Sequence, residues 1–469
     1  MSEKSTRRDV LKWTGAGAAA LAASGLPEPA LANPPHFKLY LMIFNNLQSR
    51  MIWTDLIGKQ FARLGIDVNS SYQPPSVVIA RRANDSGKTH VEGGFDMYSE
   101  RIYYNGLAPS PEALFHSKNV PPNGQNYYRI ADKQIDTAIE NYSHAITEQD
   151  RKTAMTAFVK RWYEIEPLHI VFYPEEVIIT NPKLKGMEST TYNPVFYPRP
   201  EDWTIEGATG DVTATFASWQ PPSQLIPMYG SGYNESNIFG PVYNALLEYD
   251  SWANKKLAPA LAESVKGSPD GKNWVISLRK GVKWHSGEEF TAEDVKFTWD
   301  TIIDKTYASL FQATLSTVMG SRDAYKITGT HEITVTLPQP NMLFHDFLLP
   351  VIAIMPKHAY KDIKPEELRG HVISTWLGTF PVKTSDGKVF EAKGGVGTGP
   401  WIPQGFDPSR KAYKYSKNEN YWKKTDGNVK TFYIVNIEGA DPLLSAIKSG
   451  AIDAHDPMYD VGGLLSTVD

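Results

Sequence analysis

The chain has 469 residues, with 48 Lys and Arg against 52 Asp and Glu, a net charge of −4 and no cysteine. This length is enough for two or three domains. The nearly balanced charge, without a long basic run, argues against nucleic acid or an anionic membrane as the main partner. The absence of cysteine excludes disulfides, thiolate metal sites, a thiol nucleophile and a lipid anchor on an N-terminal cysteine.

The first 32 residues have the pattern of an export signal. Arg7 and Arg8 precede a mildly apolar run at 15–23, and the Ala-Leu-Ala stretch at 30–32 offers a cleavage site. We interpret residues 1–32 as a twin-arginine signal peptide, which carries folded proteins. The alternative is an uncleaved anchor, although the apolar run is short for a bilayer span. We expect a soluble mature protein in the periplasm or at the outer face of the cytoplasmic membrane.

From residue 37 to about 200 the sequence predicts an α/β unit. A strand is expected at 37–44, an amphipathic helix at 51–65 closed by Gly65, further strands at 66–72 and from Phe95, and a strand pair or one long strand at 168–180. Two helices separated near Thr147 are expected between 132 and 166. Their expected core positions are Ile135, Ile139, Met155, Phe158 and Trp162.

The second half begins after a small, polar join at 207–210. The expected elements are a strand at 211–219, a helix at 237–250, a short helix from Leu257, a strand at 273–278, a helix capped by Thr291, a strand at 331–338, a short helix at 341–350 and an apolar helix ending at Gly450. We expect a polar connection at 370–395 and a turn at Asp270-Gly271.

Several segments of this half resemble one family. They are the block at 257–297 (LAPALAESVKGSPDGKNWVISLRKGVKWHSGEEFTAEDVKF), the helix pattern at 242–250, VGTGPW at 396–401, NENYW at 418–422 and SGAID at 449–453. Together they resemble, in the usual order, the family-5 extracytoplasmic solute-binding proteins, which feed peptide, nickel or oligosaccharide ABC importers. Each motif alone is weak, but several in a consistent order are specific.

Segments before residue 200 resemble the opposite end of the same family. They are LGIDV at 64–68, FDM at 95–97, ID at 135–136 and EPLHI at 166–170. The chain therefore resembles a circular permutant, which is physically permissible because chain ends lie at the surface. A family segment of the pattern PPFdD..vRqAl.yaiDr is not found between the two ends. Truncation, a neighbouring polypeptide that supplies the piece and a smaller lobe remain open.

The resemblance implies an α/β fold of the two-lobed type II periplasmic-binding class, with an accessory α/β domain and permuted order. We expect one lobe at 36–167, a hinge-side lobe that combines 168–250 and 395–469, and the accessory domain at 251–394. Such receptors close two lobes around a solute in the cleft. The expected partners are a peptide- or oligosaccharide-class solute and a membrane permease, with the protein itself a monomer.

Candidate ligand-binding residues lie at strand ends and loops. Trp219 and Gln220 follow the first strand after the join, Tyr233 and Asn234 lie in a Gly-rich loop, and Tyr72 ends a strand of the first unit. A turn Trp packed on its own lobe is an equal alternative for Trp219, and a helix N-cap environment is slightly favoured for the Gly-rich loop.

The stretch 101–110 is expected to face the cleft. Relatives often carry "Gw.aDypdP" there, with an aspartate that pairs with a peptide's α-ammonium. The resemblance places Tyr104 at the tryptophan and Leu107 at the aspartate, which weakens the free-peptide interpretation and leaves an aromatic platform for a sugar ring or an apolar group. Asn105 or Glu100 are alternatives for holding the ammonium. Arg101 could pair with a carboxylate ligand, although an exposed surface arginine is the more common outcome.

No pattern in the sequence indicates catalysis, a metal or a cofactor. HExxH, helical His pairs, a P-loop and a G-x-S-x-G elbow are missing. His285 and Trp401 are expected to be structural. We expect a receptor and not an enzyme; the alternatives are a secreted hydrolase of glycans or peptides, which needs opposed carboxylates or a metal, and a ligand-sensing module.

Overall fold

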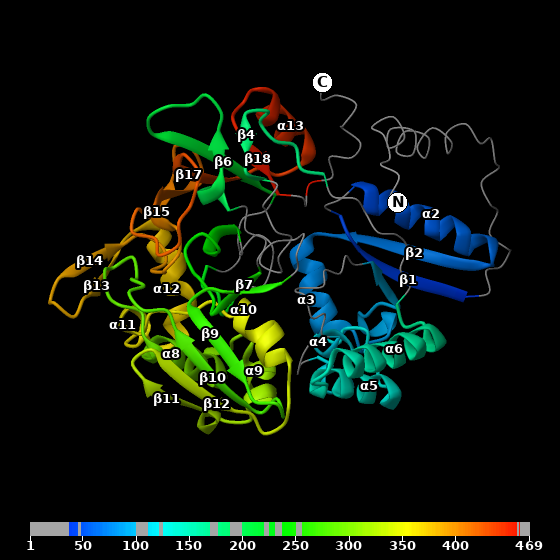
Figure 1. Cartoon of the computed structure of the whole chain (residues 1–469). Helices are drawn as coiled ribbons and strands as arrows, with labels where there is room; N and C mark the ends of the chain where they lie inside the picture. The colour runs from blue at the N-terminus through cyan, green and yellow to red at the C-terminus, as the bar shows by residue number, and fades with distance from the viewer. Residues whose placement is uncertain are drawn as a thin grey trace, which may run out of the picture.

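The computed structural model describes residues 37–45, 48–99, 111–121, 125–168, 177–187, 199–219, 225–229, 237–249, 256–456 and 459. Within these residues, helices and strands mix throughout the chain, so the expected α/β class is confirmed. Figure 1 shows the part before residue 168 as one body beside the rest of the molecule. The predicted signal peptide lies outside the described residues.

The N-terminal unit, residues 37–165, is built on a parallel sheet of order β2-β1-β3. Gly65 has a φ of 75°, which lets the chain turn directly from α2 into β2. The elements of the unit are β1 (Phe37–Phe44), α2 (Gln48–Arg63), β2 (Ile66–Gln73), α3 (Pro75–Asp85), η1 (His90–Glu92), β3 (Met97–Ser99), α4 (Glu112–Phe115), η2 (Ser117–Asn119), α5 (Lys133–His144) and α6 (Glu148–Ile165).

The two long helices of this unit begin and pack as the sequence predicts. The Asp132 side chain accepts hydrogen bonds from the first turn of α5, and the Thr147 hydroxyl caps α6. The five predicted core positions of these helices all lie in one apolar cluster around Phe115. That cluster is separate from the main core of the protein.

A five-stranded sheet of order β15-β16-β17-β6-β18 brings distant segments together. β6 runs parallel to both β17 and β18, whereas β15, β16 and β17 form an antiparallel meander. The elements of this region are β4 (Leu184–Lys185), η4 (Pro200–Asp202), β5 (Thr204–Ile205), β6 (Val212–Ser218), β15 (Trp401–Asp407), β16 (Ala412–Lys417), β17 (Val429–Asn436), α13 (Ala440–Lys448) and β18 (Ala454–His455).

Between β6 and β15 the chain forms an antiparallel sheet of order β11-β12-β10-β9, together with helices and two hairpin-like pairs. The elements here are β7 (Leu247–Tyr249), β8 (Leu257–Pro259), β9 (Ala262–Gly267), β10 (Asn273–Leu278), α8 (Ala292–Ile303), η5 (Lys305–Tyr307), α9 (Gln312–Met319), η6 (Arg322–Ala324), β11 (Tyr325–Gly329), β12 (Glu332–Thr336), η7 (Phe344–Leu348), α10 (Leu349–Val351), α11 (Lys357–Tyr360), α12 (Pro365–Leu377), β13 (Phe380–Lys383) and β14 (Val389–Ala392). One apolar core runs through this region and the five-stranded sheet.

Two segments predicted as helices adopt other structures. The segment from Leu257 forms β8 and β9, because pairing with β7 and β10 overrides its helix-forming Ala and Glu residues. The segment 237–250 keeps only a helical turn at 237–239 before β7. Gly240-Pro241 breaks that helix, since a residue before proline avoids the α region.

The prediction of a polar connection at 370–395 is also wrong. α12 runs through Leu377, and β13 and β14 form a hairpin around Asp386-Gly387, where Gly387 has a φ of 81°. The dipeptide Asp386-Gly387 is itself a sequence signal for a two-residue turn and favours such a hairpin. Residues 177–180 of the predicted strand at 168–180 are not in a strand, and 169–176 lie outside the described residues.

Candidate ligand-binding edge

Three parallel strands end side by side in the five-stranded sheet. Asn436 at the end of β17 is in register with Ser218 at the end of β6, and His455 of β18 is in register with Ala217. In open α/β sheets, ligands bind beyond the carboxyl ends of parallel strands. We call this place the carboxyl edge and define it by Ser218, Trp219, Asn436, His455 and Asp456.

Buried polar groups hold the carboxyl edge together. The side chains of His455 and Asp456 are fully buried. Asp456 Oδ2 accepts a hydrogen bond from the backbone N–H of Trp219 at 2.9 Å, and the Asp456 N–H donates to Ala217 O at 2.9 Å. These contacts fix the start of the loop that follows β6.

His455 ties a distant segment to this edge. Its Nε2 accepts the backbone N–H of Ile179 at 2.9 Å, and its Nδ1–H donates to Asp456 O at 2.6 Å. Burial lowers the pKa of His455 to about 4, so the ring is neutral at pH 7, as these two bonds require.

Asp453 makes a second connection to the same segment. Its Oδ1 accepts the side-chain amide of Asn181 at 2.9 Å, and its Oδ2 accepts the backbone N–H of Thr215 at 2.8 Å. The chain leading out of the N-terminal unit is therefore anchored next to the carboxyl edge.

Trp219 is the sequence-predicted residue that lies at this edge. Its ring packs against the cluster of Ala217, Leu443, Ile452 and Tyr459, and its indole Nε1 is buried with no hydrogen-bond partner among the residues that the structure describes. A buried Trp N–H normally finds a partner. Trp219 therefore combines a ring packed against this apolar cluster with an indole N–H that no described residue accepts.

The other predicted ligand residues do not gather here. Tyr72 lies on β2, and its hydroxyl donates to Asp55 of α2. Partial burial and this bond raise the pKa of Tyr72 to about 12. The remaining predictions, which lie outside the described residues, are Arg101, Tyr104, Asn105, Gln220, Tyr233 and Asn234.

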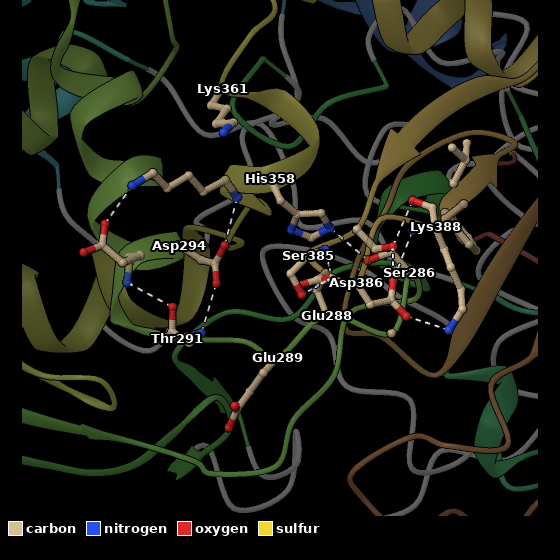
Figure 2. A pocket seen from close by; sticks show the side chains of 16 residues that line it. Ser286, Glu288, Glu289, Thr291, Asp294, His358, Lys361, Ser385, Asp386 and Lys388 are labelled. Carbon is tan, nitrogen blue, oxygen red and sulfur yellow. Dashed lines mark hydrogen bonds and ion pairs between the residues drawn. The ribbon is translucent and has the colours of Figure 1, made fainter.

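The sequence did not predict a large polar pocket of about 900 Å³ beside α8 and α11 (Figure 2). On its helical side, Lys357 Nζ pairs with Glu293 at 2.8 Å, and the Lys357 N–H donates to Asp294 at 2.8 Å. The Ser286 hydroxyl lies 2.8 Å from His358 Nε2. The N-cap at Thr291 was the one sequence signal in this area.

The hairpin β13–β14 closes the other side of the pocket in Figure 2. Lys388 Nζ pairs with Asp386 at 2.5 Å, and Glu288 accepts the backbone N–H of Ser385 at 2.6 Å. The charged groups named on both sides are thus satisfied within the protein. Satisfied polar groups need no ligand, so we favour the carboxyl edge over this pocket as the solute site.

Two expectations about structural residues are confirmed. The His285 ring accepts the N–H of Gly397 at 3.3 Å and donates to Gly399 O at 3.0 Å, so it clasps the VGTGPW turn. Burial lowers the pKa of His285 to about 4. Trp401 is fully buried in the main core, with its Nε1–H directed at Glu201 Oε2 at 3.3 Å.

Two kinds of feature are absent from the described residues. No group of three or more His, Asp or Glu side chains there is arranged to hold a metal ion. In the same part of the chain, no helix is long and apolar enough to cross a membrane.

Residues 256–461 match the sequence model of bacterial extracellular solute-binding proteins, family 5 Middle. This match covers less than half of the chain, and over these residues the chain is similar to the family-5 solute-binding proteins. The permuted order and the missing segment are not tested by this match.

Two curated proteins are similar to part of this chain. The oligopeptide-binding protein AppA of Bacillus subtilis is 27% identical over 180 residues, covering 38% of this chain and 29% of AppA. The nickel-binding periplasmic protein of Escherichia coli is 27% identical over 252 residues, covering 52% and 41%. The chain thus spans less than half the length of these relatives.

Solved structures include AppA of Bacillus subtilis with a nonapeptide, at a TM-score of 0.43 and 21% identity, covering 52% of this chain and 44% of that one. NikZ of Campylobacter jejuni with Ni(L-His) also has a TM-score of 0.43, at 22% identity, covering 55% and 45%.

Proposed function

We propose that the protein is the extracytoplasmic substrate-binding component of an ABC importer, which captures a peptide- or oligosaccharide-class solute by lobe closure and delivers it to a permease. The similarity of residues 256–461 to the family-5 solute-binding proteins supports the receptor role. One observation carries the placement of the solute: Ile179 and Asn181, on the chain leaving the N-terminal unit, are fixed at the carboxyl edge beside the unused indole N–H of Trp219.

The solute would lie between the carboxyl edge and the N-terminal unit. Trp219 would offer an aromatic surface and one donor, which suits a carbonyl or hydroxyl oxygen of the solute. The loop residues Gln220, Tyr233 and Asn234, and the stretch with Arg101, Tyr104 and Asn105, belong to the same proposal. Binding would stabilise the closed arrangement of the two lobes.

The proposed lobes follow the sequence boundaries: 36–167 for one lobe, 168–250 with 395–469 for the other, and 251–394 for the accessory domain. The pairing of β6 with β17 and β18 supports the second grouping. We also propose a circularly permuted order. A gene that encodes residues 208–469 before residues 36–207, joined by a flexible linker, should give a folded protein that binds the same ligand. If this rearranged protein is insoluble, the result counts against the permutation.

Export is proposed to follow the twin-arginine route, on the basis of Arg7 and Arg8. Replacing both with lysine should leave the precursor in the cytoplasm, whereas unchanged export would exclude this route.

A ligand screen tests the main proposal. Purified chain lacking residues 1–32 is mixed with peptide pools, oligosaccharides and nickel chelates, and the unfolding midpoint is recorded. A solute present at about 100 times its Kd should add about 2.7 kcal/mol of stability by mass action. Selective stabilisation by one class supports the receptor role and names the solute. Turnover of labelled glycans or peptides would instead establish the hydrolase alternative.

A further inference from the structure

A second, smaller cavity lies where the N-terminal unit meets the part of the chain between β6 and β15, which we call the accessory region. It has a volume of about 180 Å³ and is lined by α4 and α5 on one side and by α9 and the loop at 339–341 on the other. The two sides are joined directly, since the N–H of Met342 donates to Ser143 O at 3.2 Å. Any molecule in this cavity would contact both bodies.

Ser143 is the central observation. Its side chain is 4% exposed, it lines the cavity, and its hydroxyl has no hydrogen-bond partner in the part of the chain that the structure describes. Buried hydroxyls are nearly always satisfied. The neighbouring wall adds polar side chains from the accessory region, Thr317, Gln339 and Asn341. The cavity is therefore polar, and it contains a hydroxyl that lacks a partner.

The charge around the cavity favours a cation. Glu112 and Lys118 pair at 2.6 Å and neutralise each other, which leaves Glu140 as the further carboxylate of the lining. Glu140 contacts His116 Nε2 at 3.3 Å. The last turns of α5 and α9 also line the cavity, and helix C-termini carry partial negative charge.

The same geometry selects the kind of cation. The described residues include no trio of His, Asp and Glu groups fit for a metal ion. A carboxylate, a hydroxyl and amide oxygens instead match the three N–H donors of a primary ammonium group. At about 30 Å³ per water, the volume equals about six waters, which leaves room for only a few carbon atoms.

We propose that this cavity binds a small primary-ammonium compound of about the size of ethanolamine, with Glu140 and the Ser143 hydroxyl holding its charged end. Because the compound bridges the two bodies, its binding strengthens their contact. This site is separate from the carboxyl edge, and it does not depend on the identity of the transported solute.

The probe is ethanolamine hydrochloride added to the chain without residues 1–32, with tetramethylammonium chloride and sodium chloride at equal ionic strength as controls. Tetramethylammonium has a positive charge but no N–H donor. Calorimetry and the unfolding midpoint should show saturable binding of ethanolamine and none of tetramethylammonium. Equal responses to all three salts, or no response, would overturn the proposal.

Variants then locate the site. Ser143→Ala and Glu140→Gln should each raise the Kd for ethanolamine about fivefold to tenfold, the loss expected for one hydrogen bond to a charged group. Glu263→Gln, an exposed carboxylate on β9, is the matched control and should leave the Kd unchanged. If all three variants bind like the parent, ethanolamine binds elsewhere and the assignment fails. The assignment also fails if a crystal structure at saturating ethanolamine shows only water in the cavity.

Discussion

The ring of His455 accepts the backbone N–H of Ile179 at 2.9 Å, although 276 residues separate the two in the sequence. This bond joins the chain that leaves the N-terminal unit to the end of β18. It needs a neutral ring, because a protonated imidazole has no acceptor nitrogen. One of the hydrogen bonds that hold the segment around Ile179 to the end of β18 therefore depends on the protonation state of a buried histidine.

Acid should weaken the fold through His455. The pKa is about 4 in the folded protein and about 6.5 in the unfolded chain, so the unfolded chain binds more protons between these values. The contribution is complete above about pH 6.5 and is lost as the pH falls toward 4, by up to about 3 kcal/mol. His455→Gln should flatten this part of a plot of unfolding free energy against pH. An unchanged slope would show that His455 is protonated in the folded state.

Gly397 should tolerate no side chain. A Cβ there would lie 1.7 Å from Val242 O, a backbone atom that also accepts the N–H of Gly399 at 2.8 Å. Gly397→Ala should cost about 2 kcal/mol or more in urea unfolding. Gly370→Ala is the matched control, because it is exposed within α12 and its Cβ meets no atom within 4 Å. This control should gain about 1 kcal/mol, and equal effects at both glycines would contradict the packing around Val242.

Trp219→Phe should separate the two roles of that residue. Phenylalanine keeps an aromatic ring against Leu443 and Ile452 but removes the indole N–H, which has no hydrogen-bond partner among the described residues. The unfolding midpoint should therefore change little, whereas the Kd for the solute found in the screen should rise about threefold to tenfold. Unchanged affinity would mean that the indole N–H does not contact the solute.

Tyr72→Phe should have the opposite pattern. The hydroxyl of Tyr72 is bound to Asp55, so its removal should cost about 1 kcal/mol of stability and leave solute affinity unchanged. Isothermal titration of the solute into both variants, Tyr72→Phe and Trp219→Phe, compares their affinities. A large loss of affinity would instead show that Tyr72 contacts the solute, as the sequence predicted.

Arg151 and Asp346 form an ion pair between the N-terminal unit and the accessory region, with Nη1 and Oδ2 2.5 Å apart. Asp346 also contacts His345 Nδ1 at 2.7 Å. A double-mutant cycle with Arg151→Ala and Asp346→Ala should give a coupling energy of about 1 kcal/mol. Lys152→Ala, one position along α6 and exposed, should show no coupling to Asp346. Additive effects of the first pair would argue that the two bodies are not held together in solution.

Local signals in the sequence predicted much of the fold. The Thr291 cap with Asp294 three residues later marks the start of α8, and alternating apolar residues mark β10 and β12. The predictions failed where pairing partners are distant. β8 and β9 have helix-forming composition, but their backbone groups bond to β7 and β10.

The binding site was harder to predict than the fold. Trp219 could be placed at a strand end, because a strand followed by a loop is a local pattern. The buried pair of His455 and Asp456 gave no such signal, since its role arises from contacts with Ile179 and Trp219. The polar pocket beside α8 was missed for the same reason, because it forms only where the Asp386-Gly387 hairpin folds over the α8 start.

By itself, the sequence determined the α/β class, the resemblance to one family and the starts of α5, α6 and α8, because these depend on periodicity, capping residues and motifs within short stretches of chain. Only the tertiary structure decided that β6 lies between β17 and β18, that His455 holds Ile179, and that Ser143 faces a cavity between two bodies. Those relations join residues more than a hundred positions apart. Burial and hydrogen bonding across such separations depend on the packed chain, and no local pattern encodes them.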